Sequence, residues 1–221
     1  MNNNKVIIFG INNFAELALY YLTIDSPYEV VAFSVNKRFL PSEKLFCELP
    51  VVPFEVVETI YPPDKFFFFA PMSPKKMNLL RRDIYFKIKE KGFELINYIS
   101  SKATIFDNVI GDNCFILENN TVQPFTKIGN NVILWSGNHI GHHGIIEDHV
   151  FFSSHVVMSG RCTINSYCFL GVNSSIKDGI TLAEGTLVGM SASVMKPSKS
   201  WGVYVGNPSK RLKNKKSTDL I

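Results

Sequence analysis

The sequence predicts a small N-terminal α/β domain (Rossmann-like, with a parallel sheet) over residues 1–100 and a parallel β-solenoid over residues 101–212, with a basic tail at 213–221. Two observations predict this organisation. In the first hundred residues, short apolar runs alternate with helical patterns, which is typical of a parallel sheet flanked by helices. From Ile110 onward, one bulky apolar side chain recurs every six residues, a period that neither a helix (3.6) nor a strand (2.0) requires. Three six-residue sides per turn of a solenoid explain it.

The elements of the α/β domain follow from the apolar runs and their separators. Lys65–Ala70 is apolar on both faces, as a central parallel strand is. The domain should end near residues 100–103, after the last strand. We expect strands at Lys5–Gly10, Val30–Val35, Val51–Phe54, Lys65–Ala70 and Phe93–Ile99, and helices at Asn13–Leu22 and Pro74–Lys91.

The first strand–helix turn, Gly10–Ala15, occupies the place where dinucleotide folds carry G-x-G-x-x-G, but only its first glycine is present. One interpretation is a tight turn. The other is a helix N-terminus whose free amides meet a nucleotide phosphate or base. On the second interpretation, the candidate substrate-binding residues are Gly10, Asn12, Asn13 and Asn36.

The solenoid positions can be assigned from the six-residue period. The residue four places after each apolar anchor is mostly small or apolar, so both should point into one narrow prism. Cys114, Cys162 and Cys168 occupy such positions, which favours core packing over disulfides. Glycine often follows the anchor, where we expect corners with strained dihedral angles. The anchors are Ile110, Ile116, Val122, Ile128, Leu134, Ile140, Ile146, Phe152, Met158, Ile164, Leu170, Ile176, Leu182, Val188 and Val194.

All five histidines lie within seventeen residues, at 139, 142, 143, 149 and 155. His142 and His143 are expected at an outward-facing corner. Because residues eighteen apart stack in neighbouring coils, one column should contain Pro124, His142, Gly160 and Asp178, here called the His142 column. Three interpretations compete for the histidines: polar corner residues, a zinc site, or a general base that removes a proton from an acyl acceptor.

Charge and hydropathy bear on the partners and the cellular compartment of the protein. The net charge is +4, and no stripe of basic and aromatic residues indicates nucleic acid. No apolar stretch has the length of a signal peptide or a membrane span, so a cytoplasmic protein that binds no membrane is expected. A run of basic residues near the C-terminus favours a solvated, frayed terminus. The alternative is that this run contacts an anionic ligand. The run comprises Lys210, Arg211, Lys213, Lys215 and Lys216.

Three segments, Asn138–His143, Phe169–Asn173 and Val205–Arg211, together with the repeat, resemble bacterial hexapeptide-repeat acyltransferases. The chain is most similar to the PglD and NeuD type, acetyltransferases that act on nucleotide-linked amino sugars. The resemblance covers nearly the whole chain. It implies a left-handed β-helix, a homotrimer, acetyl-CoA in the groove between two subunits and a nucleotide held by the N-terminal domain.

The resemblance also implies roles for single residues. His142 matches the general base. The next residue is often acidic in such enzymes and orients the base, but here it is His143, so Glu147, Asp148 and Asp178 are candidates for that role. Backbone amides of Gly160, Gly171 and Gly189 should contact the thioester or pantetheine arm. Lys196, Lys210 and Arg211 should meet the CoA phosphates, and no metal is expected.

The implied function is acetyl-CoA-dependent N-acetylation of a nucleotide-linked amino sugar, such as a 4-amino-4,6-dideoxy sugar, for surface polysaccharides such as the lipopolysaccharide O-antigen. Three alternatives stay open. They are O-acetylation of a sugar hydroxyl, as in sialic-acid modification, a zinc carbonic anhydrase on the same solenoid, and a non-catalytic solenoid.

Overall fold

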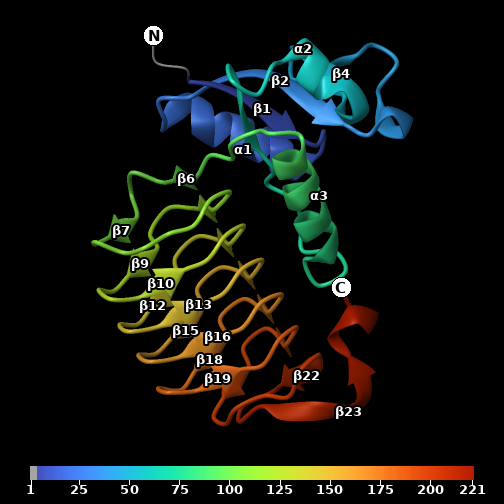
Figure 1. The fold of residues 1–221 in the computed structure, drawn as a ribbon. Coiled ribbons are helices and arrows are strands. Elements are labelled where there is room, and N and C mark those ends of the chain that lie inside the picture. The colour runs from blue at the N-terminus through green and yellow to red at the C-terminus, as the bar shows by residue number, and fades with distance from the viewer. Residues whose placement is uncertain (1–3) are drawn as a thin grey trace. The chain divides into compact units, whose positions relative to one another are not determined.

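The computed structural model describes residues 4–221, which form two compact units. The first contains the chain up to Ser73 together with Asp83–Tyr98, and the second contains Pro74–Arg82 and Ile99–Ile221. The first is a small α/β unit and the second a left-handed parallel β-helix, so the predicted fold class is confirmed (Figure 1). Across residues 4–221, none of the helices combines the length and apolar character that a membrane crossing requires.

The α/β unit is built on a five-stranded sheet in the order β3-β4-β2-β1-β5. All pairs are parallel except β3 with β4. Because β2 and β5 lie on opposite sides of β1, the chain changes direction at the carboxyl end of β1, where α/β sheets bind ligands. The strands are β1 (Lys5–Phe9), β2 (Glu29–Val35), β3 (Leu45–Phe46), β4 (Leu49–Pro53) and β5 (Phe67–Phe69). The helices are α1 (Asn13–Ile24), η1 (Lys37–Phe39), η2 (Phe54–Val56), α2 (Val57–Ile60) and α3 (Leu79–Glu90).

Three predicted elements of this region need correction. The strand expected at Phe93–Ile99 is wrong as one element, because Leu95 makes only an isolated bridge to Phe68 and Tyr98–Ile99 (β6) joins a β-helix sheet. For the same reason β5 is the last named strand of its sheet rather than a central one. The helix expected from Pro74 begins only at Leu79, since the preceding residues 76–78 have φ of 51–65°.

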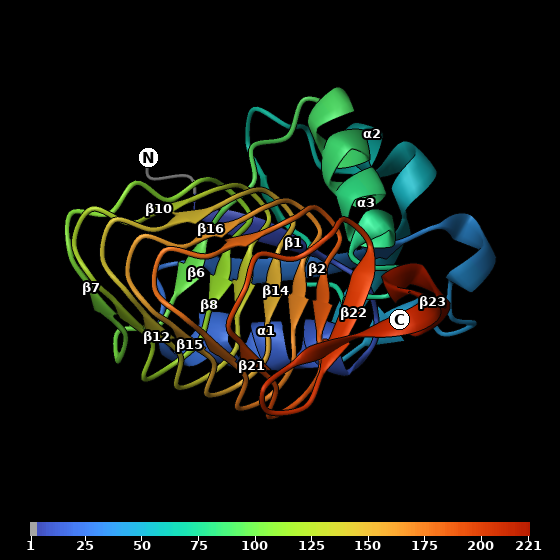
Figure 2. The ribbon, with the colours of Figure 1, turned by 90° about the horizontal axis from the view of Figure 1, so that it is seen from below.

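The β-helix consists of two-residue strands that pair in parallel with strands eighteen residues away. Ile133–Leu134, for example, pairs with Phe151–Phe152. Figure 2 shows the coils in projection, one lying over the next. The sheets have the orders β10-β13-β16-β19, β23-β22-β20-β17-β14-β11-β8-β6 and β21-β18-β15-β12-β9-β7. The strands are β7 (Thr104–Ile105), β8 (Phe115–Ile116), β9 (Thr121–Val122), β10 (Lys127–Ile128), β11 (Ile133–Leu134), β12 (His139–Ile140), β13 (Ile145–Ile146), β14 (Phe151–Phe152), β15 (Val157–Met158), β16 (Thr163–Ile164), β17 (Phe169–Leu170), β18 (Ser175–Ile176), β19 (Thr181–Leu182), β20 (Leu187–Val188), β21 (Ser193–Val194), β22 (Gly202–Val205) and β23 (Lys210–Lys216).

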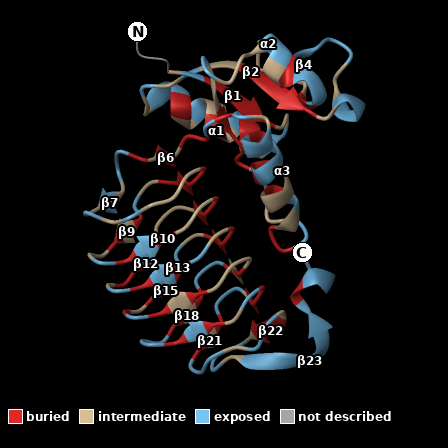
Figure 3. Cartoon of the chain, in the orientation of Figure 1, coloured by how far each residue is buried: buried red, intermediate tan, exposed pale blue. Residues whose placement is uncertain are grey.

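The predicted anchors form the core of the prism. Every anchor from Ile116 to Val194 is at most 2% exposed, and Ile110 packs against the same cluster. Figure 3 shows buried residues recurring from strand to strand along the β-helix. The six-residue assignment of inward positions is therefore confirmed.

The reason given for the glycines that follow the anchors is wrong. Positive φ occurs at the third residue after the anchor, in every hexad from Asn113 to Ser191. The glycines directly after anchors lack positive φ and are needed because the next coil is too close: a Cβ on Gly141 would lie 2.6 Å from the backbone nitrogen of Gly160. Asparagine and histidine tolerate the left-handed conformation better than most residues, which accounts for many of the corner residues.

Residues 74–82 are fastened to the β-helix by a buried guanidinium. Arg81 is fully buried and donates hydrogen bonds to the carbonyl oxygens of Asn131 and Val150 and to Asn78 Oδ1. Burial lowers the pKa of Arg81 to about 9. Met77, which is also buried, packs in a cluster with Leu187 and Val203.

The C-terminal segment is an ordered strand, which corrects the expectation of a frayed tail. Strand β23 runs antiparallel to β22, and its side chains are exposed. Beyond it, Ser217 is buried and its hydroxyl donates to the carbonyl oxygen of Gly185. The basic side chains are therefore solvated but held in place by backbone pairing.

Candidate functional site

The His142 column forms as predicted, on one edge of the prism. Strand β12 pairs with β15 and β15 with β18, so the corner residues that follow these strands stack eighteen residues apart. His142 is half-buried, and its backbone N–H donates to Gln123 Oε1 at 3.0 Å. Lys196 lies one coil further along the same edge, since β18 pairs with β21.

The ring of His142 is held on one side by His143. Their Nδ1 atoms are 3.0 Å apart and the rings are nearly perpendicular. Only one of the two nitrogens can carry the shared hydrogen. When His142 donates it, the Nε2 atom of His142 is left unprotonated, as a general base requires. The exposed ring of Phe125 lies against His143, with centroids 4.7 Å apart.

The other side of the His142 ring faces Gly160 and Asp178. A Cβ atom built on Gly160 would lie 2.9 Å from His142 Nε2 and 3.0 Å from Asp178 Oδ1. Gly160 is buried, and its N–H donates to no group within residues 4–221. A basic nitrogen, a carboxylate and an unpartnered backbone donor therefore lie close together on this edge.

The remaining histidines do not join this group. His139 and His155 are exposed, on a strand and at another corner. His149 is buried, its Nδ1 lies 2.9 Å from Asn131 Nδ2, and its ring stacks on Tyr167. Burial, and secondarily the charge of Arg81, lower the pKa of His149 to about 4, so this side chain is neutral at pH 7. Within the described part of the chain, no three His, Cys, Asp or Glu side chains are arranged to hold a metal.

The three acidic residues considered for orienting His142 lie in different places, and His143 rather than any of them contacts Nδ1. Asp148 accepts the backbone N–H of Asn130 at 2.6 Å and its side-chain amide at 3.2 Å, so it supports a different corner. Glu147 is exposed on the strand side of that corner. Asp178 lies in the column, but on the Nε2 side of His142. The group that contacts Nδ1 is His143.

The predicted coenzyme-binding residues are distributed over two edges and the terminal hairpin. Gly171 and Gly189 follow strands β17 and β20 of another sheet, and their N–H groups donate to Val188 and Tyr204 carbonyl oxygens at 2.8 Å. They therefore differ from Gly160, whose N–H has no such partner. Lys196 shares the edge of Gly160, and Lys210 begins β23, both with exposed side chains.

The predicted nucleotide-binding residues lie at the carboxyl ends of β1 and β2. Gly10 has φ of 110°, and its N–H donates to the carbonyl oxygen of Ser34. Asn12 caps α1 by accepting the N–H groups of Phe14 and Ala15 at 3.0 and 3.3 Å, so two amides expected to be free are already bonded. Asn13 is the first residue of α1.

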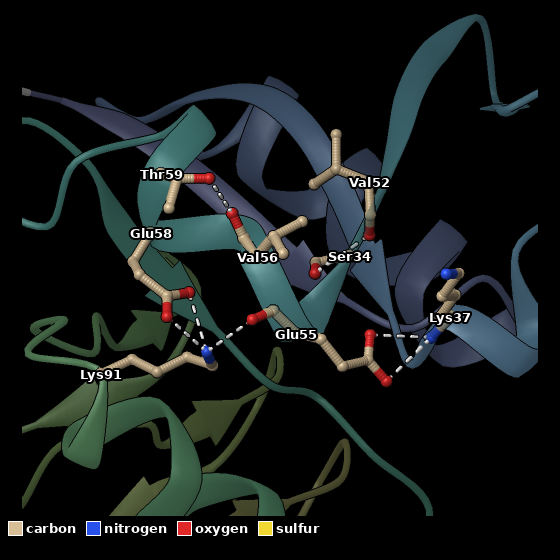
Figure 4. Close-up of polar contacts among 8 residues, drawn as sticks. All are labelled: Ser34, Lys37, Val52, Glu55, Val56, Glu58, Thr59 and Lys91. Carbon is tan, nitrogen blue, oxygen red and sulfur yellow. Dashed lines mark hydrogen bonds and ion pairs between the residues drawn. The ribbon is translucent and has the colours of Figure 1, made fainter.

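Asn36 borders an open hollow of about 590 Å³ that is otherwise lined by charged residues. Figure 4 shows the carboxylate of Glu55 accepting the backbone N–H of Lys37, at 2.9 and 3.1 Å. Nearby, Lys91 pairs with Glu58 at 2.7 Å, which lowers the pKa of Glu58. Sequence reasoning missed three cations that line the hollow, of which two lie in η1 and one in α3. They are Lys37, Arg38 and Lys87.

Comparison with protein families identifies the repeat itself. The family described as bacterial transferase hexapeptide (six repeats) matches residues 109–142. Among curated proteins, the chain is 25% identical over 107 residues to the acyl-[acyl-carrier-protein]–UDP-N-acetylglucosamine O-acyltransferase of Sinorhizobium fredii. That match covers 45% of this chain and 40% of the relative, so less than half of the relative's length is spanned.

Solved structures match over nearly the whole chain. A perosamine N-acetyltransferase variant from Caulobacter crescentus, in complex with CoA and GDP-perosamine, is 19% identical with a TM-score of 0.84, covering 95% of this chain and 97% of that one. The acetyltransferase domain of PglB from Neisseria gonorrhoeae, in complex with acetyl coenzyme A, is 21% identical with a TM-score of 0.84, covering 96% and 100%. The predicted resemblance to hexapeptide-repeat sugar acetyltransferases is confirmed, and at these identities it shows the fold.

Proposed function

We propose that this protein transfers an acetyl group from acetyl-CoA to the amino group of a nucleotide-linked sugar, such as a 4-amino-4,6-dideoxy sugar, in the cytoplasmic synthesis of surface polysaccharides. One observation carries the proposal: His142 is held through Nδ1 while its Nε2 lies beside Gly160, whose buried N–H has no acceptor among residues 4–221. Neighbours of the same fold that bind CoA with GDP-perosamine, or acetyl-CoA, support the choice of substrates.

In the proposed reaction, binding both substrates in one groove supplies much of the rate by positioning. The neutral amine attacks the thioester carbonyl, and His142 Nε2 takes the proton that the nitrogen loses. The N–H of Gly160 stabilises the oxyanion. When the C–S bond breaks, the proton passes from His142 to the CoA thiolate, so the products are the N-acetyl sugar and free CoA.

Direct transfer, without a covalent enzyme intermediate, agrees with the burial and the raised pKa of three cysteine thiols. Burial raises the pKa of Cys114 and Cys168 to about 12, and it also raises that of Cys162. A thiol with so high a pKa is a poor nucleophile because almost none of it is thiolate at neutral pH. An acetyl-cysteine intermediate on these side chains is therefore disfavoured.

The nucleotide is assigned to the carboxyl edge of the α/β sheet, at Gly10, Asn12, Asn13 and Asn36. The cations that border the hollow beside Asn36 provide charge for a pyrophosphate. Glu55 already accepts the amide of Lys37. That part of the hollow therefore suits hydrogen-bond donors better than phosphate.

The active form is proposed to be a homotrimer, with acetyl-CoA between two protomers. The apolar side chain of Phe125, next to the His142 column, is 71% exposed in the single chain. Its exposure supports contact with another protomer along this edge of the prism. Lys196, one coil beyond Asp178, is proposed to meet CoA phosphates.

The direct test is release of free thiol from acetyl-CoA in the presence of GDP-, UDP- and dTDP-linked 4-amino sugars. We expect release with at least one of them, N-acetyl product by mass spectrometry, and a mass of three chains in sedimentation. Free and nucleotide-linked sugars without amines are the controls. A chain that releases no thiol with any amino sugar would contradict the proposal.

The contact between the two histidines gives a second prediction. His143→Asp should keep kcat within about threefold of the native value, because a carboxylate accepts the Nδ1–H of His142 and aspartate tolerates a left-handed corner. His143→Ala removes the acceptor and should lower kcat by about 10–100-fold, the worth of a hydrogen bond to a charged group. Steady-state kinetics of the two variants provide the check. Equal losses in both would show that His143 does not orient the base.

A further inference from the structure

The proposed mechanism gives no role to the carboxylate of Asp178, which lies in the His142 column. Its side chain is exposed, and among the described residues it has no hydrogen bond and no ion pair. Lys177, Lys196 and Arg161 are the cationic residues nearest to it along the coils, and none lies within ion-pair distance. Asp178 therefore presents an uncompensated negative charge beside the histidine.

Asp178 cannot orient His142 in the usual way. The orienting hydrogen bond is made at Nδ1, and that atom contacts His143. Asp178 faces Nε2, the nitrogen that has to receive a proton. A direct bond between this carboxylate and Nε2 would occupy the base, so the carboxylate has to act on whatever lies between them.

Gly160 keeps the space between these two groups open. Both His142 Nε2 and Asp178 Oδ1 lie within 3.0 Å of the position where a Gly160 side chain would begin. Less than about 6 Å therefore separates them, a span that one nitrogen or oxygen atom bridges with two hydrogen bonds of about 3 Å. Gly160 has no positive φ, so nothing in its backbone requires glycine, and the requirement comes from the two facing side chains.

We propose that Asp178 and His142 together bind the acceptor nitrogen above Gly160, and that Asp178 makes the acceptor an amine rather than a hydroxyl. This inference rests on the proposed function and names its acceptor class. An amino sugar arrives largely as an ammonium ion, which a lone carboxylate attracts. It loses one proton to solvent before attack.

The same carboxylate also acts during the reaction. Attack on the thioester places positive charge on the nitrogen and negative charge on the carbonyl oxygen. Asp178 stabilises the first, the Gly160 N–H stabilises the second, and His142 takes the second proton and returns it to the CoA thiolate. A hydroxyl brings no positive charge to the site, so it gains much less from Asp178.

The decisive variant is Asp178→Asn, which keeps the shape and removes the charge. With GDP-perosamine, or the panel member that the native protein acetylates, we expect kcat/KM for the acceptor to fall about 10–100-fold. The KM for acetyl-CoA and the melting temperature should not change. The matched control is Glu184→Gln, an exposed carboxylate at the same position of another hexad, which should behave as the native protein.

Two further measurements separate acceptor binding from a structural role. The native protein should favour the 4-amino sugar over its 4-hydroxy counterpart at least about 100-fold, and Asp178→Asn should reduce that ratio. Gly160→Ala, which forces the two facing side chains apart without backbone strain, should also lower kcat/KM for the acceptor in a folded protein.

The outcomes are distinguishable. Unchanged acceptor kcat/KM in Asp178→Asn, or equal use of the amino and hydroxy sugars by the native protein, overturns this assignment and leaves the acetyltransferase proposal intact. Failure of the native protein with every amino sugar overturns both. A loss in Asp178→Asn that is matched by a fall in melting temperature assigns the residue to folding and also contradicts the inference.

Discussion

Replacing His142 by alanine is expected to lower kcat by about 10²–10⁴ while leaving the fold and assembly intact, the usual range for removal of a general base. The side chain is half-buried at a corner and contributes nothing to the apolar interior of the prism. Its loss therefore removes a proton acceptor without opening a cavity. Thiol release at saturating substrate, together with the sedimentation mass, measures both parts of the prediction.

The chain offers a close control for this variant. His155 is another exposed corner histidine, and its ring lies 2.9 Å from the Cβ position of Gly137, much as His142 lies against Gly160. His155→Ala should retain native turnover. If His142→Ala turns over as fast as the native protein, His142 is not the base.

Replacing Ile146 by aspartate is expected to abolish soluble, folded protein. Ile146 is 1% exposed and stacks between Ile128 and Ile164 in the centre of the coils. An aspartate there would place a carboxylate in a dry apolar column with no partner, at a cost of several kcal/mol, comparable to the whole stability of many domains. The soluble fraction after expression and the circular dichroism of any recovered protein provide the measurement.

The neighbouring residue is the natural comparison. Ile145 has the same side chain in the same two-residue strand but faces outward and is 41% exposed. Ile145→Asp should express and fold. A soluble and folded Ile146→Asp protein would contradict the inward register of the hexads.

The solenoid could be predicted because an apolar side chain recurs every six residues along the sequence. Burial of one residue in six requires no knowledge of distant contacts, and the pairing of residues eighteen apart follows from three sides per coil. The steric reason for the glycines that follow the anchors could not be predicted in the same way. The close approach that excludes a Cβ from Gly141 involves the backbone of a different coil, which no local pattern reports.

The α/β unit was harder to delimit because strand-like composition does not reveal a partner. Phe93–Ile99 looks like one strand, yet its residues pair in two different sheets. Residues 76–78 look helical, but their positive φ leads the chain into the burial of Arg81. Both outcomes depend on tertiary contacts that outweigh local propensity.

The candidate site was partly accessible from sequence. A spacing of eighteen residues is enough to place His142, Gly160 and Asp178 in one column. The pairing of His142 with His143 through Nδ1 depends on ring orientation, and the lowered pKa of His149 depends partly on the charges of Arg81 and Arg82 on α3. Sequence position alone could not separate these three histidines.

Strand β23 has a consequence for how copies of this protein behave in concentrated solution. A β-helix that stopped at its last parallel strand would expose a row of unpaired amides and carbonyls on which another molecule could continue the stack. Here an antiparallel strand rich in lysine and arginine pairs with β22 at the end of one of the three sheets, and its like charges disfavour a second copy there. At that sheet, strand addition by another molecule is therefore disfavoured.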